Sequence, residues 1–260
     1  MMDEKSFMRQ FSNNVVFICG MLFFVEIALA APDATQMLTR CEEHTRGNTL
    51  QAELKLTIQK PDWSRSMTMK VWQKGLDFSL ILISDPARDK GTSFLKIKSE
   101  VWNWLPKVER IVKIPPSMMM QSWMGSDFTN DDLVKESSIV RDYTHKVISE
   151  GTQDGESCWQ LELLPKPESA VVWGKLVCWL EKEDPYLMRR MEYYDEDGGR
   201  VNVLTFSDVK ELGGRRLPTR LEMTPQEKNG QKTVLQYHAM KFDETLDDSF
   251  FSEQNLKKVR

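Results

Sequence analysis

Apolar and polar residues alternate along most of the chain with a period of two, which is typical of β-strands. The clearest example is residues 50–59, where polar side chains separate Leu50, Ala52, Leu54, Leu56 and Ile58. Such alternation gives a strand one apolar and one polar face. Similar segments follow up to residue 105 and again over residues 141–240. The pattern therefore predicts a mainly β protein.

Turn signals divide these segments in the second half of the chain. Gly198-Gly199, Gly213-Gly214 and Asn229-Gly230 separate the last segments at nearly even spacing, and Asn-Gly is a strong hairpin signal. We expect an antiparallel meander of about ten or eleven strands. Because long twisted strands make a sheet curl, the expected fold is a single unclosed β-barrel, or half-barrel, whose concave face is apolar. Short helices must act as a lid over that face.

Two segments can supply these helices. The first is Asp33 to Arg46, which ends at Gly47 and carries the apolar stripe Met37, Leu38 and Cys41. The second follows Pro115-Pro116.

This second segment is dense in flexible apolar side chains. At helical spacing Met119 lies over Trp123, and Gly125 is a typical stop signal. Thr129 then predicts the N-cap of a new helix, with Asp132 three residues further on. Methionine re-packs easily against partners of different shape. Two interpretations remain open: a lid over an apolar cavity, or a plug in the protein's own core.

The N-terminal residues have the pattern of a secretory signal. Lys5 and Arg9 precede a mostly apolar stretch, and Ala28-Leu29-Ala30 is an A-x-A cleavage site. We therefore expect a signal peptide at residues 1–30 and a single exported domain at residues 31–260. Cys19 lies inside the apolar stretch, which argues against lipid attachment there.

The sequence offers little that supports catalysis. The three histidines, His44, His145 and His238, are far apart and lack the spacing of metal ligands. No nucleophile motif or phosphate loop is recognisable. The net charge of −4 does not indicate the basic surface that nucleic-acid binding needs. We expect no catalytic residue, no metal, no cofactor and no enzyme activity, although activity against acyl esters would revive a hydrolase hypothesis.

Cysteine usage leaves one question open. Cys158 and Cys178 lie on two predicted strands joined through residues 165–170. A symmetric hairpin would place them opposite each other, so a cross-strand disulfide in an oxidising compartment and two buried free thiols are equally compatible with the sequence.

One stretch resembles a known family. The runs W-N-W-L-P-K-V-E-R-I and M-M-M-Q-S-W-M-G-S-D-F-T-N-D-D-L, within Trp102 to Leu133, are similar to the signature of outer membrane lipoprotein-sorting proteins, the LolA-like relatives of the periplasmic carriers LolA and LolB. The order of signal, helix, meander, helical insertion and further strands extends the resemblance over the whole mature chain.

The resemblance implies an unclosed barrel whose cavity holds lipids or lipoprotein acyl chains. It also implies a monomeric carrier in the periplasm of a Gram-negative bacterium. Such a carrier shuttles between an inner-membrane transporter, such as an ABC or RND-type permease, and an outer membrane acceptor. The alternative is a periplasmic sensor that uses the same half-barrel to detect lipid or lipoprotein.

On this basis we expect twelve residues to bind the hydrophobic ligand. The expected lid face comprises Met118, Met119, Met120, Trp123, Met124 and Phe128. The expected cavity wall comprises Trp102, Trp104, Leu54, Leu56, Met69 and Leu80.

Overall fold

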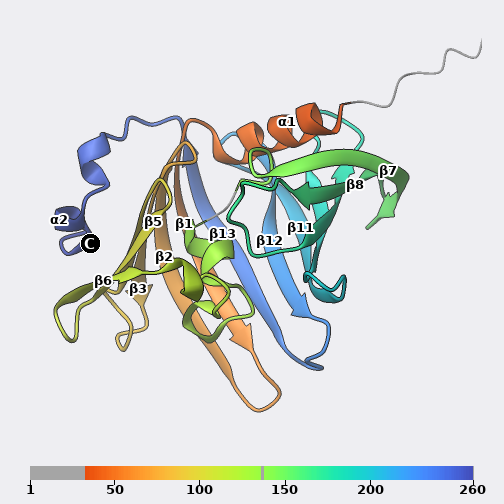
Figure 1. Ribbon diagram of the computed structural model, residues 1–260. Helices are drawn as coiled ribbons and strands as arrows, with labels where there is room; N and C mark the ends of the chain where they lie inside the picture. The colour runs from red at the N-terminus through yellow and green to blue at the C-terminus, as the bar shows by residue number, and fades with distance from the viewer. Residues whose placement is uncertain (1–32, 136–137, 260) are drawn as a thin grey trace, which may run out of the picture. The chain divides into compact units, whose positions relative to one another are not determined.

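The computed structural model describes residues 33–135 and 138–259, and the predicted signal peptide lies outside the described residues. A single 13-stranded antiparallel sheet dominates this part of the chain (Figure 1). Its strands are β1 (Thr49–Gln59), β2 (Ser64–Lys74), β3 (Phe78–Asp85), β4 (Ser93–Ile97), β5 (Glu100–Leu105), β6 (Arg110–Ile114), β7 (Tyr143–Gln153), β8 (Glu156–Pro165), β9 (Lys175–Glu181), β10 (Met188–Tyr194), β11 (Arg200–Leu212), β12 (Arg215–Pro225) and β13 (Lys232–Phe242).

The sheet is an open meander. Its spatial order is β6-β5-β4-β3-β2-β1-β13-β12-β11-β10-β9-β8-β7, so the first and last strands pair at the centre and β6 and β7 form the two edges. The sheet curls without closing, as the long alternating strands predict, which confirms the unclosed barrel. Residues 115–135, which follow the edge strand β6, lie in front of the concave face (Figure 1). We call residues 115–135 the lid segment.

The predicted strand number was too low. The structure has thirteen strands instead of ten or eleven, and β6 is a strand that the pattern missed. In this edge strand Ile111 packs against the convex cluster, Ile114 packs against the concave core, and Val112 is 45% exposed. Its apolar residues are therefore divided between the two faces, so no period of two marks this strand.

The N-terminal helix agrees with its sequence signals. Helix α1 (Ala34–Arg46) begins at the N-cap Asp33, whose carboxylate accepts a hydrogen bond from the Thr35 amide at 2.9 Å, and ends at Gly47 with φ of 62°. Met37, Leu38 and Cys41 are buried in the core of the concave face. Helix α1 therefore covers one end of the curled sheet.

The lid segment is not the α-helix that the spacing predicted. It forms two short 3₁₀ turns, Pro116–Met118 and Trp123–Gly125, and Met124 has a left-handed φ of 49°. The carbonyls of Met119 and Gln121 accept hydrogen bonds from the amides of Asp131 and Asn130 at 3.1 and 2.9 Å. These tertiary bonds take acceptors that an α-helix needs for its own ladder.

The predicted helix start after this turn is confirmed. The Thr129 hydroxyl accepts from the Asp132 amide at 3.1 Å, and the Asp132 carboxylate accepts from the Thr129 amide at 2.8 Å. This reciprocal pair is a capping box. The helix that follows, Asp131–Lys135, is a single turn with π-type hydrogen bonding.

A second apolar cluster covers the opposite, convex face of the sheet. The C-terminal segment forms a 3₁₀ turn, Asp248–Phe250, and helix α2, Glu253–Leu256. Phe251 and Leu256 pack against Leu80, with Trp102 and Trp104 at the margin. Residues on both faces of β3 are therefore buried, in contrast to strands such as β1 with one polar face.

The three cysteines in the described residues are free thiols. Cys178 pairs with Leu161, three positions from Cys158, which pairs with Glu181. An odd offset puts the two side chains on opposite faces of the sheet, so of the two alternatives left open by the sequence the structure has the free thiols. Burial raises the pKa of Cys41 to about 12 and raises that of Cys178 further.

We expect these thiols to be inert in the folded protein. With residues 31–260 at neutral pH, a thiol reagent added without reductant should label almost no cysteine in buffer, because the thiolate is the reactive form. In urea it should label Cys41, Cys158 and Cys178 together. Labelling of only one cysteine in urea would show that the other two form a disulfide.

Candidate functional site: a cavity under the lid segment

The concave face encloses an apolar cavity of about 310 Å³. Side chains from α1, from strands of both halves of the sheet and from the lid segment line it. A second hollow of about 220 Å³ adjoins it, and Leu133, Leu221 and Leu235 line both. Their combined size falls within the range of ordinary ligand pockets. The apolar and aromatic lining residues include Leu50, Ala52, Leu54, Met69, Val71, Ile81, Trp123, Leu133, Met188, Met191, Phe206, Leu217, Leu221, Leu235, Tyr237 and Met240. Polar residues also line the cavity: Glu42, Thr45, Arg46, Gln73, Asp132 and Ser138.

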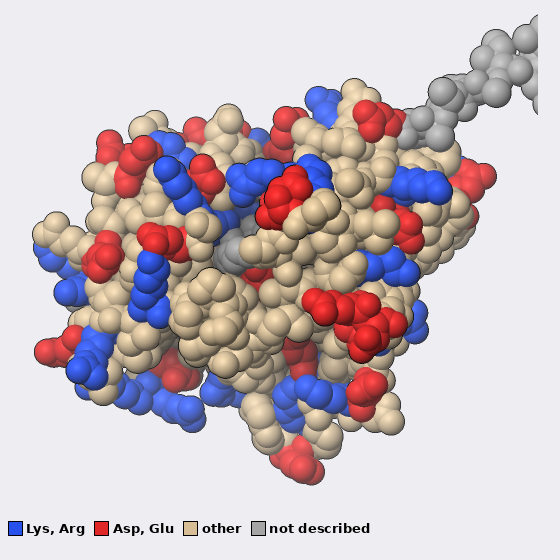
Figure 2. Space-filling view, in the orientation of Figure 1, with Lys and Arg blue, Asp and Glu red and all other residues tan. Residues whose placement is uncertain are grey.

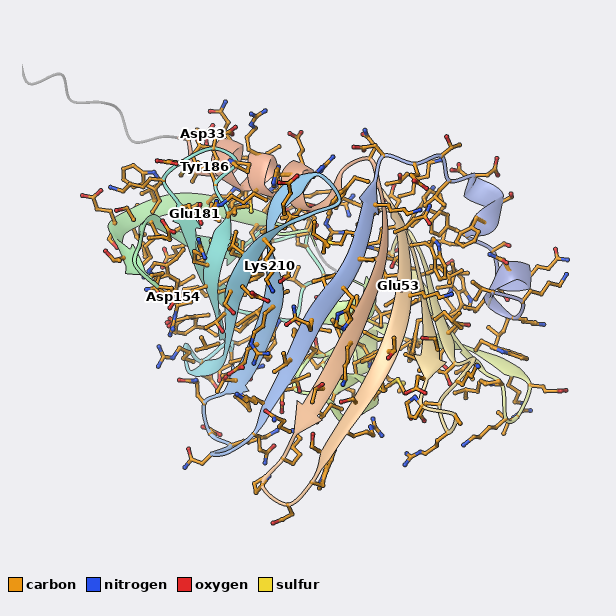
Figure 3. All side chains as sticks on the ribbon, turned by 180° about the vertical axis from the view of Figure 1, so that it is seen from behind. Asp33, Glu53, Asp154, Glu181, Tyr186 and Lys210 are labelled. Carbon is orange, nitrogen blue, oxygen red and sulfur yellow. The ribbon has the colours of Figure 1, made fainter. Side chains whose placement is uncertain are left out.

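The strands create this apolar lining through their alternation. On β1, Leu50, Ala52 and Leu54 face the cavity while Glu53 between them is exposed. Figure 3 shows Glu53 on the convex side of the sheet, seen from behind. The period of two in the sequence therefore produces the concave wall directly.

The lid segment closes the cavity with one indole ring. Trp123 is 1% exposed, lines the cavity, and packs on Phe94 of β4 with ring centroids 5.3 Å apart. Its neighbours in the same core cluster are Met119, which is buried, and Met124, which is partly buried. This segment therefore both fills part of the core and covers a hollow, so each of the two interpretations of the sequence describes part of it.

Polar contacts hold the lid segment to the tips of the central strands. The Lys60 ammonium donates to the Asp127 carboxylate at 2.6 Å and to the Gln231 side chain at 2.9 Å. The other Asp127 oxygen accepts from the Thr233 hydroxyl at 2.7 Å. The Asp127 side chain is only 2% exposed. We call Lys60, Asp127 and Thr233 the latch.

A separate hydrogen bond joins the lid segment to β2. The Arg65 guanidinium of β2 donates to the Met124 carbonyl at 2.5 Å. The lid segment is thus attached to β2 as well as to the latch.

The outer surface of the lid segment carries two exposed methionines beside uncharged polar residues. Met118 and Met120 are 38% and 53% exposed. Figure 2 shows a surface largely free of charged side chains over this part of the molecule. Trp63, at the tip of the β1–β2 hairpin, is also 50% exposed.

The predicted ligand-binding residues lie in four places. Leu54, Met69 and Trp123 line the cavity, and Phe128 lines the second hollow. Leu56, Met119 and Met124 belong to the same core cluster without lining either hollow. Met118 and Met120 point to solvent. Trp102, Trp104 and Leu80 belong to the cluster on the convex face, so their placement on the cavity wall is wrong.

The sequence-based list missed the wall supplied by the second half of the chain. Met188, Met191, Leu221, Leu235 and Tyr237 lie on β10, β12 and β13. Their alternating pattern was visible in the sequence, but only the pairing of β1 with β13 places Leu235 and Tyr237 beside Leu56 and Leu54. Asp131 and Asp132 were also missed, because an acidic pair at a helix start resembles a solvated cap. Asp131 is only 4% exposed, and Asp132 lines both hollows.

The described residues contain no cluster of three His, Cys, Asp or Glu side chains that could hold a metal ion. None of the helices in the described part of the chain has the length and apolar character needed to span a membrane.

Comparisons with known proteins identify the fold and the family. Residues 75–258 match the model of a family described as uncharacterized protein. A search of curated proteins gives no match. A DUF1329 family protein from Desulfovibrio piger is 25% identical, with a TM-score of 0.78 over 86% of this chain and 97% of that chain.

Two further solved structures share the fold over 86% of this chain and 100% of theirs. A LolA superfamily protein from Nitrosomonas europaea is 23% identical with a TM-score of 0.74. A putative outer membrane lipoprotein-sorting protein domain from Vibrio parahaemolyticus is 22% identical with a TM-score of 0.75. The chain therefore belongs to the family whose model matches residues 75–258, and its open barrel has the same fold as these LolA-like structures.

Proposed function

We propose that the protein is a periplasmic carrier that binds lipids or lipoprotein acyl chains in the cavity under the lid segment and moves them between the inner and outer membranes. The observation that carries the proposal is the apolar cavity itself, enclosed by the sheet, α1 and Trp123. The LolA-like fold supports it, because one structure with that fold is described as a lipoprotein-sorting domain.

The energetics favour alkyl chains as ligands. Each CH₂ group moved from water into an apolar site contributes about 0.8 kcal/mol. A chain of ten carbons therefore gains several kcal/mol even after the cost of ordering it. Most of the residues that line the cavity are apolar, so most of an alkyl chain bound there needs no matching polar group.

We expect the lid segment to move during loading and release, because its Trp123 lines the cavity and is only 1% exposed. The latch and the Arg65 contact are the polar interactions that opening must break. A carrier of this kind works with an inner-membrane transporter of the ABC or RND type and with an outer membrane acceptor. The binding step involves no covalent chemistry.

A transfer assay tests this function. Residues 31–260 should accelerate the movement of a fluorescent phospholipid from donor to acceptor vesicles above its spontaneous rate, in proportion to protein concentration. The purified protein should also take up the fluorescent apolar probe N-phenyl-1-naphthylamine. Binding without transfer would favour the sensor alternative, and failure of both would contradict a lipid-binding role.

A further inference from the structure

One side of the second hollow is polar: it shares Arg46 and Asp132 with the main cavity and adds Asp131, Tyr143 and Tyr193. These five side chains lie beside apolar residues of the sheet. They come from the lid segment, β7, β10 and α1. We call this part of the second hollow the polar compartment. It adjoins the apolar cavity, as the headgroup site of an amphiphile must.

Asp132 stands at the junction of the two hollows. Its carboxylate accepts hydrogen bonds from the Trp173 indole at 3.1 Å and from the Thr129 amide at 2.8 Å. Each carboxylate oxygen has room for more than one donor. Because Asp132 lines both hollows, a ligand in the cavity can reach this carboxylate without any rearrangement of the lid segment.

Two tyrosines are also available to a ligand. Tyr143 and Tyr193 are 2% and 7% exposed, and both line the polar compartment. Neither hydroxyl makes a hydrogen bond to a described residue. A polar ligand group in the polar compartment would lie within reach of these hydroxyls, which can both donate and accept a hydrogen bond.

The electrostatics of the polar compartment favour a positive group. Burial, with a smaller contribution from Asp131, raises the pKa of Asp132 to about 6. Burial and the charges of Asp131, Asp132 and Asp142 raise the pKa of Tyr143. Burial and the same pair of lid carboxylates also raise the pKa of Tyr193.

Arg46 is the cation that lines the polar compartment among the described residues, and it lies 3.6 Å from the Glu42 carboxylate. Where a neighbouring carboxylate raises the pKa of a group, a further negative charge at that place is disfavoured. An ammonium group or a neutral donor placed there would be stabilised, and an anion would be repelled.

We propose that the polar compartment binds the headgroup of the cavity's ligand, and that this headgroup is an amine or another hydrogen-bond donor instead of an anion. The inference rests on the proposed function, since it needs an alkyl chain in the adjoining cavity. It goes further by naming the class of amphiphile that the protein selects.

A displacement experiment tests this selection. N-phenyl-1-naphthylamine bound to residues 31–260 is displaced at about pH 7.5 by decylamine, decanol or decyl sulfate, which share one chain. We expect decylamine to displace the probe at least about tenfold more effectively than decyl sulfate, with decanol between them. In Asp132→Asn the ratio of decylamine to decyl sulfate should fall to within about threefold of unity. The control Glu53→Gln removes a carboxylate from the convex face and should keep the wild-type ratio.

A pH series on the unmodified protein avoids any folding defect of the variant. Below about pH 6 Asp132 is protonated and loses its attraction for a cation, so the ratio should fall as the pH decreases from about 7.5 to 5. Decylamine remains protonated and decyl sulfate remains ionised over this range, as the reference values for an amine near 10 indicate.

The outcomes separate the two proposals. Displacement by all three probes with a ratio that neither Asp132→Asn nor pH changes would overturn the headgroup inference and leave the carrier proposal intact. Failure of every alkyl probe to displace the dye would contradict the carrier proposal itself. Stronger displacement by decyl sulfate than by decylamine would show that Arg46 dominates the polar compartment and would also overturn the inference.

Discussion

Replacing Asp127 with alanine is expected to lower the free energy of unfolding by about 3 kcal/mol and to loosen the lid segment. The change leaves the Lys60 ammonium without its carboxylate, and the Lys60 side chain is only 15% exposed. It also removes the acceptor of the Thr233 hydroxyl. Breaking a buried pair by removing one partner costs several kcal/mol, and the remaining Gln231 contact reduces the loss.

Urea denaturation and amide hydrogen exchange measure the two effects. The amides of Trp123 and Asn130, which donate to the Phe128 and Gln121 carbonyls within the lid segment, should exchange much faster in the variant. Asp184→Ala is the matched control, because it removes a carboxylate from the Arg40–Asp184 pair, in which both side chains are 53% exposed. We expect this control to change stability little. Equal behaviour of the two variants would show that the latch does not hold the lid segment.

Replacing Leu221 with tryptophan is expected to reduce the affinity for alkyl ligands by at least about tenfold, because the larger side chain occupies the space of several CH₂ groups. Leu221 of β12 lines both hollows and pairs with Leu235 on β13. The adjoining cavity can accept much of the added ring, so the stability cost should be below about 2 kcal/mol.

Titration with N-phenyl-1-naphthylamine measures this affinity. Leu164→Trp adds the same ring at an outer position of β8 that is 45% exposed, and it should bind the probe as the wild type does. Unchanged affinity in Leu221→Trp, with the protein folded, would mean that the probe binds outside the cavity.

The sequence predicted the fold well because both of its principal signals are local. Alternation over strands such as β1 indicated the curled sheet, and the Asp33 cap with Gly47 indicated α1. The capping box of Thr129 and Asp132 was recognisable for the same reason. Strand β6 was missed because its apolar and polar residues do not alternate with a period of two.

The cavity wall was only partly predictable because a period of two does not say which face is concave. On β5, Val101 packs in the concave core while Trp102 and Trp104 lie on the convex side. Phe251, in the C-terminal segment, covers the convex face. No local sequence pattern in β5 indicates this contact.

The latch was unpredictable for a related reason. Lys60, Asp127 and Thr233 come from three segments far apart in the chain, and only the curled sheet brings them together. The conformation of the lid segment was also unpredictable. Tertiary hydrogen bonds to the carbonyls of Met119 and Gln121 prevent the α-helix that the spacing of Met119 and Trp123 predicts.

Native mass spectrometry of residues 31–260, purified from a periplasmic fraction without detergent, tests most directly whether the cavity holds a hydrophobic ligand. Solvent extraction of the same sample identifies what is bound. We expect a lipid or an acylated peptide to co-purify with the wild type and to be lost in Leu221→Trp but not in Leu164→Trp. A wild-type protein that is empty, and that takes up no added lipid, would contradict the account.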